Sequence, residues 1–216
     1  MSELSLLVHE GCALEWLADN KLPSDSAVLT SLPSYDEFGH RDADRWRDWF
    51  VDAARTVLET SAHARATVFF QTDVEHEGTW LDKSFLIQQA ALAVAAPLVW
   101  HKLVLRAPIG TTCVQRPGYA HLLCFSQTVR RSEANAAPDV LPTLGKQLWP
   151  RGMGQDVAAF VVSWLRQHAG AGTLVAPFCG VGTALHAARS QGLHAIGIER
   201  NPGRAARARK PVTPPA

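Results

Sequence analysis

Two glycines and a carboxylate in the last quarter of the chain have types and spacing that could bind a ligand. Thr173–Leu185 is predicted to form a short buried strand, a turn at Gly180 and Gly182, and the start of a helix. Glycine lets the backbone turn sharply and approach a ligand, which the N–H groups of the following helix would then face. Glu199 ends the next predicted strand, where a carboxylate can hold the hydroxyls of an adenosine ribose. An ordinary tight strand-to-helix turn is the alternative reading of the same pattern.

A second loop, Ser31–Tyr35, also follows directly on a predicted strand. In an open α/β sheet, ligands bind outside the carboxyl ends of the strands. The two loops are therefore expected to meet in one crevice, although they lie far apart in the sequence. Taken alone, the second loop is also compatible with a simple proline-containing turn that ends a strand.

The elements that must position these loops are strands alternating with amphipathic helices, which indicates a parallel sheet with helices on both faces. We predict an α/β fold of about seven strands, with an antiparallel pair near its end. The predicted strands are Leu4–Val8, Ser26–Ser31, Thr67–Thr72, Leu98–Arg106, Tyr119–Phe125 and the strands ending at Ala176 and Ile198; the main helices are Asp42–Leu58, Asp82–Ala95 and Gln155–His168. Residues 126–149 are predicted to be a long surface loop.

Composition sets broad limits on the class of protein. The chain has 216 residues, a net charge of +1 and 47% hydrophobic residues, which is typical of a globular protein. We predict a single domain over residues 1–210 and a disordered, proline-rich tail at 211–216. Its four cysteines lack the spacing of a zinc site or a disulfide framework. No signal peptide is recognisable, and the longest apolar run is too short to span a bilayer, so we expect a cytoplasmic protein.

Several short motifs follow one another in a characteristic order. They are Gly11-Cys12, Ser31-Leu-Pro-Ser-Tyr35, Trp100-His-Lys102, the helix Gln155–His168, Ala176-Pro-Phe-Cys-Gly-Val-Gly-Thr183 and Gly197-Ile-Glu199. Across about residues 4–208, this series resembles the S-adenosylmethionine-dependent methyltransferases that act on exocyclic amino groups of nucleic-acid bases, the N4-cytosine/N6-adenine superfamily, in circularly permuted form. The resemblance implies a Rossmann-like class I methyltransferase sheet whose chain begins at the usual third strand and ends after the second.

The resemblance also implies a cofactor, S-adenosylmethionine, and the residues that would hold it. Glu199 would accept hydrogen bonds from the ribose, and the glycines would admit the methionine part against the backbone. The cofactor-binding residues carried over are Cys12, Ala176, Pro177, Phe178, Cys179, Gly180, Gly182, Thr183 and Glu199. Two of them depart from the family pattern, because Ala176 and Cys12 each stand where relatives carry Asp.

The catalytic residues carried over are Ser31, Leu32, Pro33 and Tyr35. An exocyclic amino group of a base is a poor nucleophile, because its lone pair is delocalised into the ring. Acceptors aimed at its N–H bonds, from the Ser31 side chain and the Leu32 carbonyl, would localise that lone pair toward the methyl group. Tyr35 would stack on a displaced base. This loop departs from the family too, with Leu32 for the first proline and Ser34 where an aromatic residue is expected. The chemistry requires no metal.

The expected partner is nucleic acid. The candidate substrate-binding residues are Asp73, Lys83, His101, Lys102 and Arg116, although a structural role is an equal alternative for His101 and Lys102. The loops available for base recognition are small, which favours structured RNA over DNA. No membrane contact is expected, and the oligomeric state stays open. The alternatives are a DNA amino-methyltransferase, a non-catalytic nucleotide- or RNA-binding module of the same fold, and a nicotinamide dehydrogenase. Leu185 disfavours the dehydrogenase, because it occupies the position of the third glycine of that motif.

Overall fold

The computed structural model describes residues 4–37 and 42–210. The segment 211–216, predicted to be a disordered tail, lies outside the described residues, and the predicted domain boundary stays a prediction. The elements are β1 (Leu6–Glu10), α1 (Ala13–Asp19), β2 (Ser26–Thr30), η1 (Tyr35–Glu37), α2 (Ala43–Thr60), β3 (Thr67–Gln71), β4 (Val74–His76), β5 (Thr79–Leu81), α3 (Lys83–Ala93), β6 (Leu98–Leu105), β7 (Tyr119–Phe125), η2 (Glu133–Asn135), β8 (Val140–Leu141), α4 (Gln155–His168), β9 (Thr173–Pro177), α5 (Thr183–Ser190), β10 (His194–Glu199) and α6 (Pro202–Ala208).

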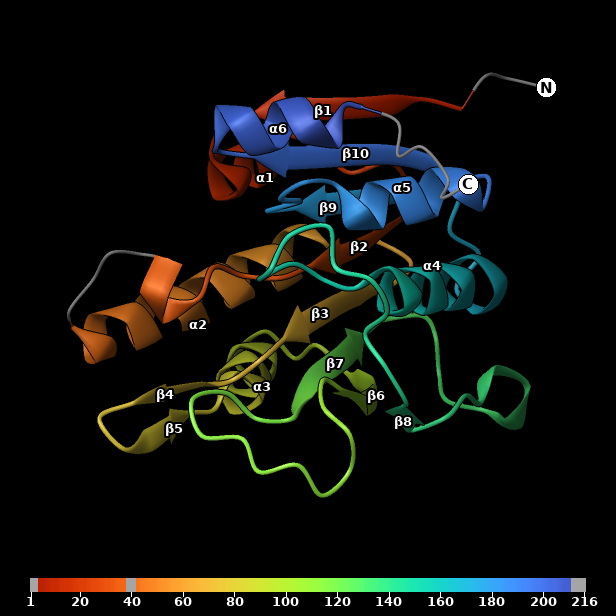
Figure 1. Cartoon of the computed structure of the whole chain (residues 1–216). Coiled ribbons are helices and arrows are strands. Elements are labelled where there is room, and N and C mark those ends of the chain that lie inside the picture. The colour runs from red at the N-terminus through yellow and green to blue at the C-terminus, as the bar shows by residue number, and fades with distance from the viewer. Residues whose placement is uncertain (1–3, 38–41, 211–216) are drawn as a thin grey trace.

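One eight-stranded sheet organises the molecule, in the order β1-β10-β9-β2-β3-β7-β6-β8 (Figure 1). The first five strands of this order are parallel, whereas β7 runs antiparallel to both β3 and β6. The predicted α/β fold with an antiparallel pair is therefore confirmed. The first and last strands of the chain, β1 and β10, are hydrogen-bonded neighbours. The circular permutation concerns the strand order relative to other proteins, and it stays a prediction.

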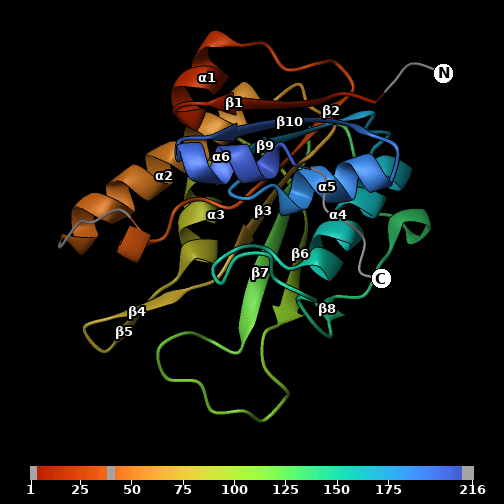
Figure 2. The same ribbon diagram turned by 45° about the horizontal axis from the view of Figure 1, so that its top comes forward.

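Helices cover both faces of the sheet (Figures 1 and 2). One apolar core packs α4, α5 and α6 against one face, and a second core packs α1, α2 and α3 against the other. The central strands β2, β3 and β9 are buried at every position, as expected for parallel strands covered on both sides. The carboxyl ends of β2, β9 and β10 consequently lie together at one edge of the sheet.

Helix α2 illustrates how the sequence defines these layers. Asp42 caps its first turn by accepting hydrogen bonds from the backbone N–H groups of Asp44 and Arg45. Trp46 and Phe50, one turn apart, are both fully buried in the core beneath the helix. The helix predicted over Asp42–Leu58 is thus confirmed, with its end two residues later.

The structure adds two features that the sequence pattern did not indicate. Residues 126–149 are not a plain loop, because β8 pairs with β6 and extends the sheet to eight strands. A short hairpin, β4–β5, follows β3 and projects from the body of the molecule (Figure 2). Among the described residues, no helix has the length and apolar character needed to cross a membrane.

Candidate active site

The two loops singled out in the sequence line one pocket at the carboxyl edge of the sheet. Its wall is formed by the ends of β2, β9 and β10, with further residues from the segment before α4 and from α6. The lining residues include Gly11, Thr30, Ser31, Leu32, Pro33, Glu37, Trp149, Arg151, Ala176, Phe178, Cys179, Gly180, Thr183, Glu199 and Arg204. The expected convergence with the glycine turn is therefore observed for the first three residues of the Ser31–Tyr35 loop.

Glu199 joins the glycine turn to the loop that follows β10. The residue is 6% exposed, and its two side-chain oxygens accept hydrogen bonds from the backbone N–H groups of Gly180 (2.9 Å) and Asn201 (2.8 Å). A carboxylate oxygen can accept more than one hydrogen bond, so each keeps capacity for a ligand hydroxyl. The carboxylate thus fixes the loops and still lines the pocket.

The backbone of the glycine turn adopts conformations that favour glycine. Gly180 and Gly182 have φ values of 58° and 87°, and Phe178 has the unusual value of 57° for a residue with a side chain. A Cβ atom added to Gly180 would meet no atom within 4 Å, so its backbone faces open space. A Cβ on Gly182 would lie 2.9 Å from the Cα of Ala208 in α6. Gly180 therefore leaves room in the pocket, whereas Gly182 permits close packing behind it.

Leu185 packs in a way that separates this turn from a dinucleotide-binding turn. It is fully buried, and its Cδ1 atom would lie 2.5 Å from a Cβ atom at Gly197 on β10. The close approach of helix and strand is thus provided by Gly197, not by a glycine at position 185. This arrangement agrees with the sequence argument against a nicotinamide dehydrogenase.

The acceptor loop, defined here as Ser31–Tyr35, starts from a firmly anchored strand end. The Thr30 hydroxyl donates a hydrogen bond to the Pro177 carbonyl (2.7 Å), which ties β2 to β9 beneath the pocket. Ser31 and the adjoining Leu32 line the pocket. The Leu32 carbonyl accepts a hydrogen bond from Gln71 Nε2 at 3.5 Å, and the Leu32 side chain is buried in the core. Gln71 was not identified from the sequence, because it lies within a buried strand.

The second half of the acceptor loop turns away from the pocket. The Ser34 hydroxyl accepts a hydrogen bond from Lys83 Nζ (2.9 Å). The Tyr35 ring packs against the rings of His76 and Trp46, with centroids 4.7 and 6.0 Å away. Tyr35 is not among the residues that line the pocket. Stacking of Tyr35 on a base would therefore require a rotation of this side chain.

Asp36 follows the acceptor loop and connects it to two distant segments. It forms ion pairs with Arg116, from the loop before β7, and with Arg151, from the segment before α4, at 3.1 and 2.9 Å. Burial acts to raise the pKa of Asp36, but the Ser34 hydrogen bond and the charges of Arg151 and Arg116 outweigh it and lower that pKa. The loop is thus held by electrostatic contacts from outside its own strand.

Aromatic and basic residues close the pocket from the side of α6. The Trp149 ring lies under the guanidinium groups of Arg204 and Arg207, at 5.5 and 5.9 Å. Arg204 also approaches Glu37, with 3.6 Å between Nη1 and the carboxylate. Trp149 and Arg151 were missed in the sequence, since they lie in a segment without periodicity. Only the folded chain brings them to the pocket.

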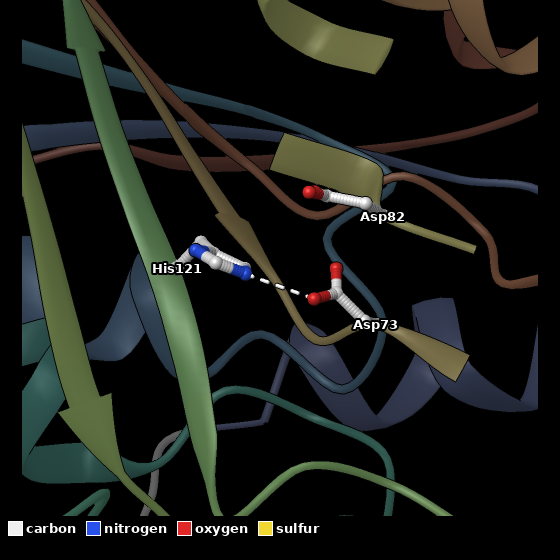
Figure 3. Close-up of side chains that lie close together, drawn as sticks. All are labelled: Asp73, Asp82 and His121. Carbon is white, nitrogen blue, oxygen red and sulfur yellow. Dashed lines mark hydrogen bonds and ion pairs between the residues drawn. The ribbon is translucent and has the colours of Figure 1, made fainter. Parts of the chain in front are cut away.

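Asp73, Asp82 and His121 lie close together just beyond the end of β3, and His121 is hydrogen-bonded to Asp73 (Figure 3). His121 Nε2 lies 3.0 Å from the Asp73 carboxylate, and His121 Nδ1 lies 3.0 Å from His101 Nε2. Burial, and then the neighbouring His121, lower the pKa of His101. One ligand atom each from Asp73, Asp82 and His121 lies within 4.8 Å of the others, so this group has the residue types that hold a metal ion. His121 was not identified as a site candidate, because in sequence it is one residue of a buried strand.

The remaining predicted residues divide between the pocket and structural positions. Lys102 lies on the face of β6 that is covered by α4, away from the acceptor loop. There its ammonium donates hydrogen bonds to the Ala137 carbonyl and to Asp139. Cys12 precedes α1, and the pocket is lined by its neighbours Gly11 and Ala13. Burial, followed by the charge of Glu199, raises the pKa of Cys179 to about 12, so this thiol stays protonated near neutral pH.

Comparison with known proteins identifies the fold. No protein-family model matches the sequence, and no curated protein sequence matches it. In structure, the chain is similar to TTHA0409 from Thermus thermophilus, provisionally assigned as a DNA modification methylase and complexed with S-adenosyl-L-methionine, at 20% identity over 94% of this chain and 90% of that one, with a TM-score of 0.68. It is also similar to PvuII DNA methyltransferase (cytosine-N4-specific), at 16% identity, 96% and 86% coverage and a TM-score of 0.71.

A third similar structure is the complex of M1.HpyAVI with S-adenosylmethionine, at 16% identity, 94% and 97% coverage and a TM-score of 0.60. These structures match nearly the whole of both chains. The protein therefore has the α/β fold of these methyltransferase structures, and the methyltransferase fold that the motif series predicts is confirmed. At these levels of identity, the similarity concerns the fold.

Proposed function

We propose that this protein is an S-adenosylmethionine-dependent methyltransferase that acts on an exocyclic amino group of a base in nucleic acid. The observation that carries the proposal is the shared pocket, in which Glu199 and Gly180 face Ser31 and Leu32 from the neighbouring strand end. The pocket supports this function more specifically than the fold does, because one fold can host many activities.

The half of the pocket beside Glu199 and Gly180 would bind the adenosine and methionine parts of S-adenosylmethionine. Glu199 would accept hydrogen bonds from the ribose hydroxyls with the capacity left after it binds the backbone. The open space at Gly180 would admit the methionine part, and Phe178 would form a wall beside it. Ala176 is 1% exposed and offers no carboxylate, so the contact that Asp provides in relatives is missing here. When bound, the cofactor supplies an electrophilic methyl group on a sulfonium.

The acceptor half of the pocket would activate and orient the amino group. The Ser31 hydroxyl and the Leu32 carbonyl would accept hydrogen bonds from its N–H groups, which would concentrate the lone pair on nitrogen and direct it toward the methyl group. Gln71 already donates to the Leu32 carbonyl and so keeps it in place. Fixed position and alignment contribute the rest of the acceleration.

The nature of the nucleic acid is a finer part of the proposal. In the sequence, the small size of the loops available for base recognition favours structured RNA as the substrate. The similar structures, however, are described as DNA methylases. We therefore propose DNA as the substrate to be tested first, with structured RNA as the comparison. The target base stays open.

The test is incubation of the protein with methyl-labelled S-adenosylmethionine and either DNA or total RNA, followed by mass spectrometry of the nucleosides. We expect label on an amino nitrogen of a base in the DNA pool. Label in RNA alone would reverse the choice of substrate. Label in neither pool, with cofactor binding demonstrated by calorimetry, would favour the non-catalytic nucleotide-binding module that Ala176 and the altered Ser31–Tyr35 motif suggest.

A further inference from the structure

Lys83 is a buried cation in contact with the acceptor loop. It is the first residue of α3, is 3% exposed, and its Nζ atom donates a hydrogen bond to Ser34 Oγ at 2.9 Å. Its backbone N–H donates to Asp73, and its ammonium lies 5.8 Å from the centre of the Trp46 ring. The side chain is therefore fixed at both ends and directed at one hydroxyl.

This placement is energetically unusual for an ammonium group. Within the described part of the chain, Lys83 forms no ion pair; its closest polar partner is the neutral Ser34 hydroxyl. Burying a charge without a directly bonded counter-ion costs free energy, and an apolar side chain would avoid that cost. The position is better explained by what the cation does to the loop than by its contribution to stability.

The second buried lysine provides a contrast within the same protein. Lys102 is also 3% exposed, but it pairs with Asp139 at 3.2 Å and donates to the Ala137 carbonyl at 2.7 Å. It lies on the opposite face of the sheet and fastens a loop to β6. Lys102 therefore has the counter-ion that Lys83 lacks.

Ser34 transmits the contact with Lys83 to the rest of the loop. Its hydroxyl lies near Asp36 and lowers the pKa of that carboxyl, and Asp36 in turn pairs with Arg116 and Arg151. A continuous path thus runs from Lys83 through Ser34 and Asp36 to an arginine of the pocket wall. Ser31 and Leu32 lie just before this braced segment in the chain.

We propose that Lys83 is a positioning residue for methyl transfer, which holds the acceptor loop through Ser34 so that Ser31 and the Leu32 carbonyl face the pocket. The inference rests on the proposed function for its catalytic part. Its structural part, the ordering of the loop by Lys83, is independent of that function. Lys83 acts through Ser34 and does not contact the reacting atoms.

The charge of Lys83 gives the proposal a pH dependence. Burial, and secondarily the charge of Arg116, lower the pKa of Lys83 to about 8, while the more distant carboxylates Asp73, Asp36 and Glu37 act to raise it. The protonated amine makes the stronger hydrogen bond to Ser34. Methyl transfer is therefore expected to decline as pH rises through about 8.

The experiment compares Lys83→Met and Ser34→Ala with the wild-type protein by amide hydrogen exchange over residues 31–37. Loss of a hydrogen bond to a charged group corresponds to roughly ten-fold faster exchange or more in both variants. The double variant should show no further increase, because both changes break the same contact. Lys102→Met is the matched control for loss of a buried ammonium, and it should leave exchange over 31–37 unchanged.

The catalytic part is tested by measuring kcat for methyl transfer with the same proteins at saturating S-adenosylmethionine. We expect Lys83→Met to lower kcat roughly ten-fold, to leave S-adenosylmethionine affinity within about two-fold, and to lose the decline of kcat near pH 8. Unchanged loop exchange in both variants would overturn the proposal. Faster exchange with unaltered kcat and pH profile would reduce Lys83 to a structural role. If the wild-type protein transfers no methyl group, the proposed function fails while the exchange result still decides whether Lys83 orders the loop.

Discussion

The two halves of the pocket are built in different ways. The glycine turn is fixed by backbone geometry and by Glu199, which lies on the adjacent strand. The acceptor loop is fixed by charged side chains from three other segments, at Lys83, Arg116 and Arg151. A site of the first kind depends on few residues. A site of the second kind is sensitive to substitutions far from the reacting atoms.

The largest effect is expected at Glu199. Glu199→Ala removes the acceptor for two backbone N–H groups and for the ribose, so S-adenosylmethionine affinity should fall roughly 100-fold. Glu199→Gln keeps one acceptor oxygen and should give an intermediate loss. Isothermal titration calorimetry measures both. Wild-type affinity in Glu199→Ala would show that the ribose is held elsewhere.

The two glycines of the turn should respond differently to a methyl group. Gly180→Ala places its Cβ in open space, so we expect roughly ten-fold weaker cofactor binding from the strained φ and the obstructed pocket. Gly182→Ala meets the backbone of Ala208 and should instead lower the melting temperature by several degrees. Calorimetry and thermal unfolding of both proteins distinguish the effects. The same loss of affinity with no loss of stability in both variants would mean that Gly182 also borders the ligand.

Ser31→Ala tests the acceptor half alone. Loss of one hydrogen bond to the amino group should slow methyl transfer roughly ten-fold and leave cofactor affinity unaltered. Single-turnover transfer with labelled cofactor provides the rate. A parallel fall in cofactor affinity would contradict the separation of the pocket into two halves.

Lys83, which holds the acceptor half, should also make the free energy of unfolding of the protein depend on pH. Because its pKa is lowered from 10.5 to about 8, the unfolded chain binds more protons than the folded one between these values, and this residue's contribution to stability rises with pH there. The free energy of unfolding of Lys83→Met at pH 7 should therefore exceed that of the wild type by about 1 kcal/mol or more. This difference should shrink as the pH rises toward 10. Urea unfolding at several pH values measures it. A variant that is markedly less stable at pH 7 would indicate an ordinary structural lysine.

The smallest effect is expected from removal of metal ions. The proposed transfer uses no metal, so exhaustive chelation should leave the rate of methyl transfer unchanged. If the reaction did need a metal ion, its expected ligands would be Asp73, Asp82 and His121. Loss of activity on chelation, restored by one divalent ion, would show that this cluster takes part in the reaction.

The sequence predicted the glycine turn because its features are local. Gly180, Gly182 and Glu199 occupy positions whose backbone geometry follows from strand, turn and strand in succession. The strands and helices of the sheet were predictable for the same reason, since periodicity and caps such as Asp42 are local patterns. The two-residue strand β8 was not, because its pairing with β6 depends on tertiary contacts.

The acceptor loop was predictable in place but not in the direction of its side chains. The orientation of Ser34 depends on Lys83, and that of Tyr35 on Trp46 and His76, all from other elements. Lys83 itself was selected only as a substrate-binding candidate, because its position at a strand's end said nothing of its contact with Ser34. Long-range contacts of this kind carry no signature in a single sequence.

The most direct measurement is a crystal structure of the protein with S-adenosylmethionine. We predict cofactor density in the pocket between Gly180 and Ser31, with the ribose hydroxyls against Glu199 and the methyl group directed at the acceptor loop. A second cavity of about 700 Å³ lies between α4 and α5, lined by residues that include Gln155, His186 and Arg189. Cofactor bound there, or density absent from both cavities at saturating concentration, would contradict the proposed site.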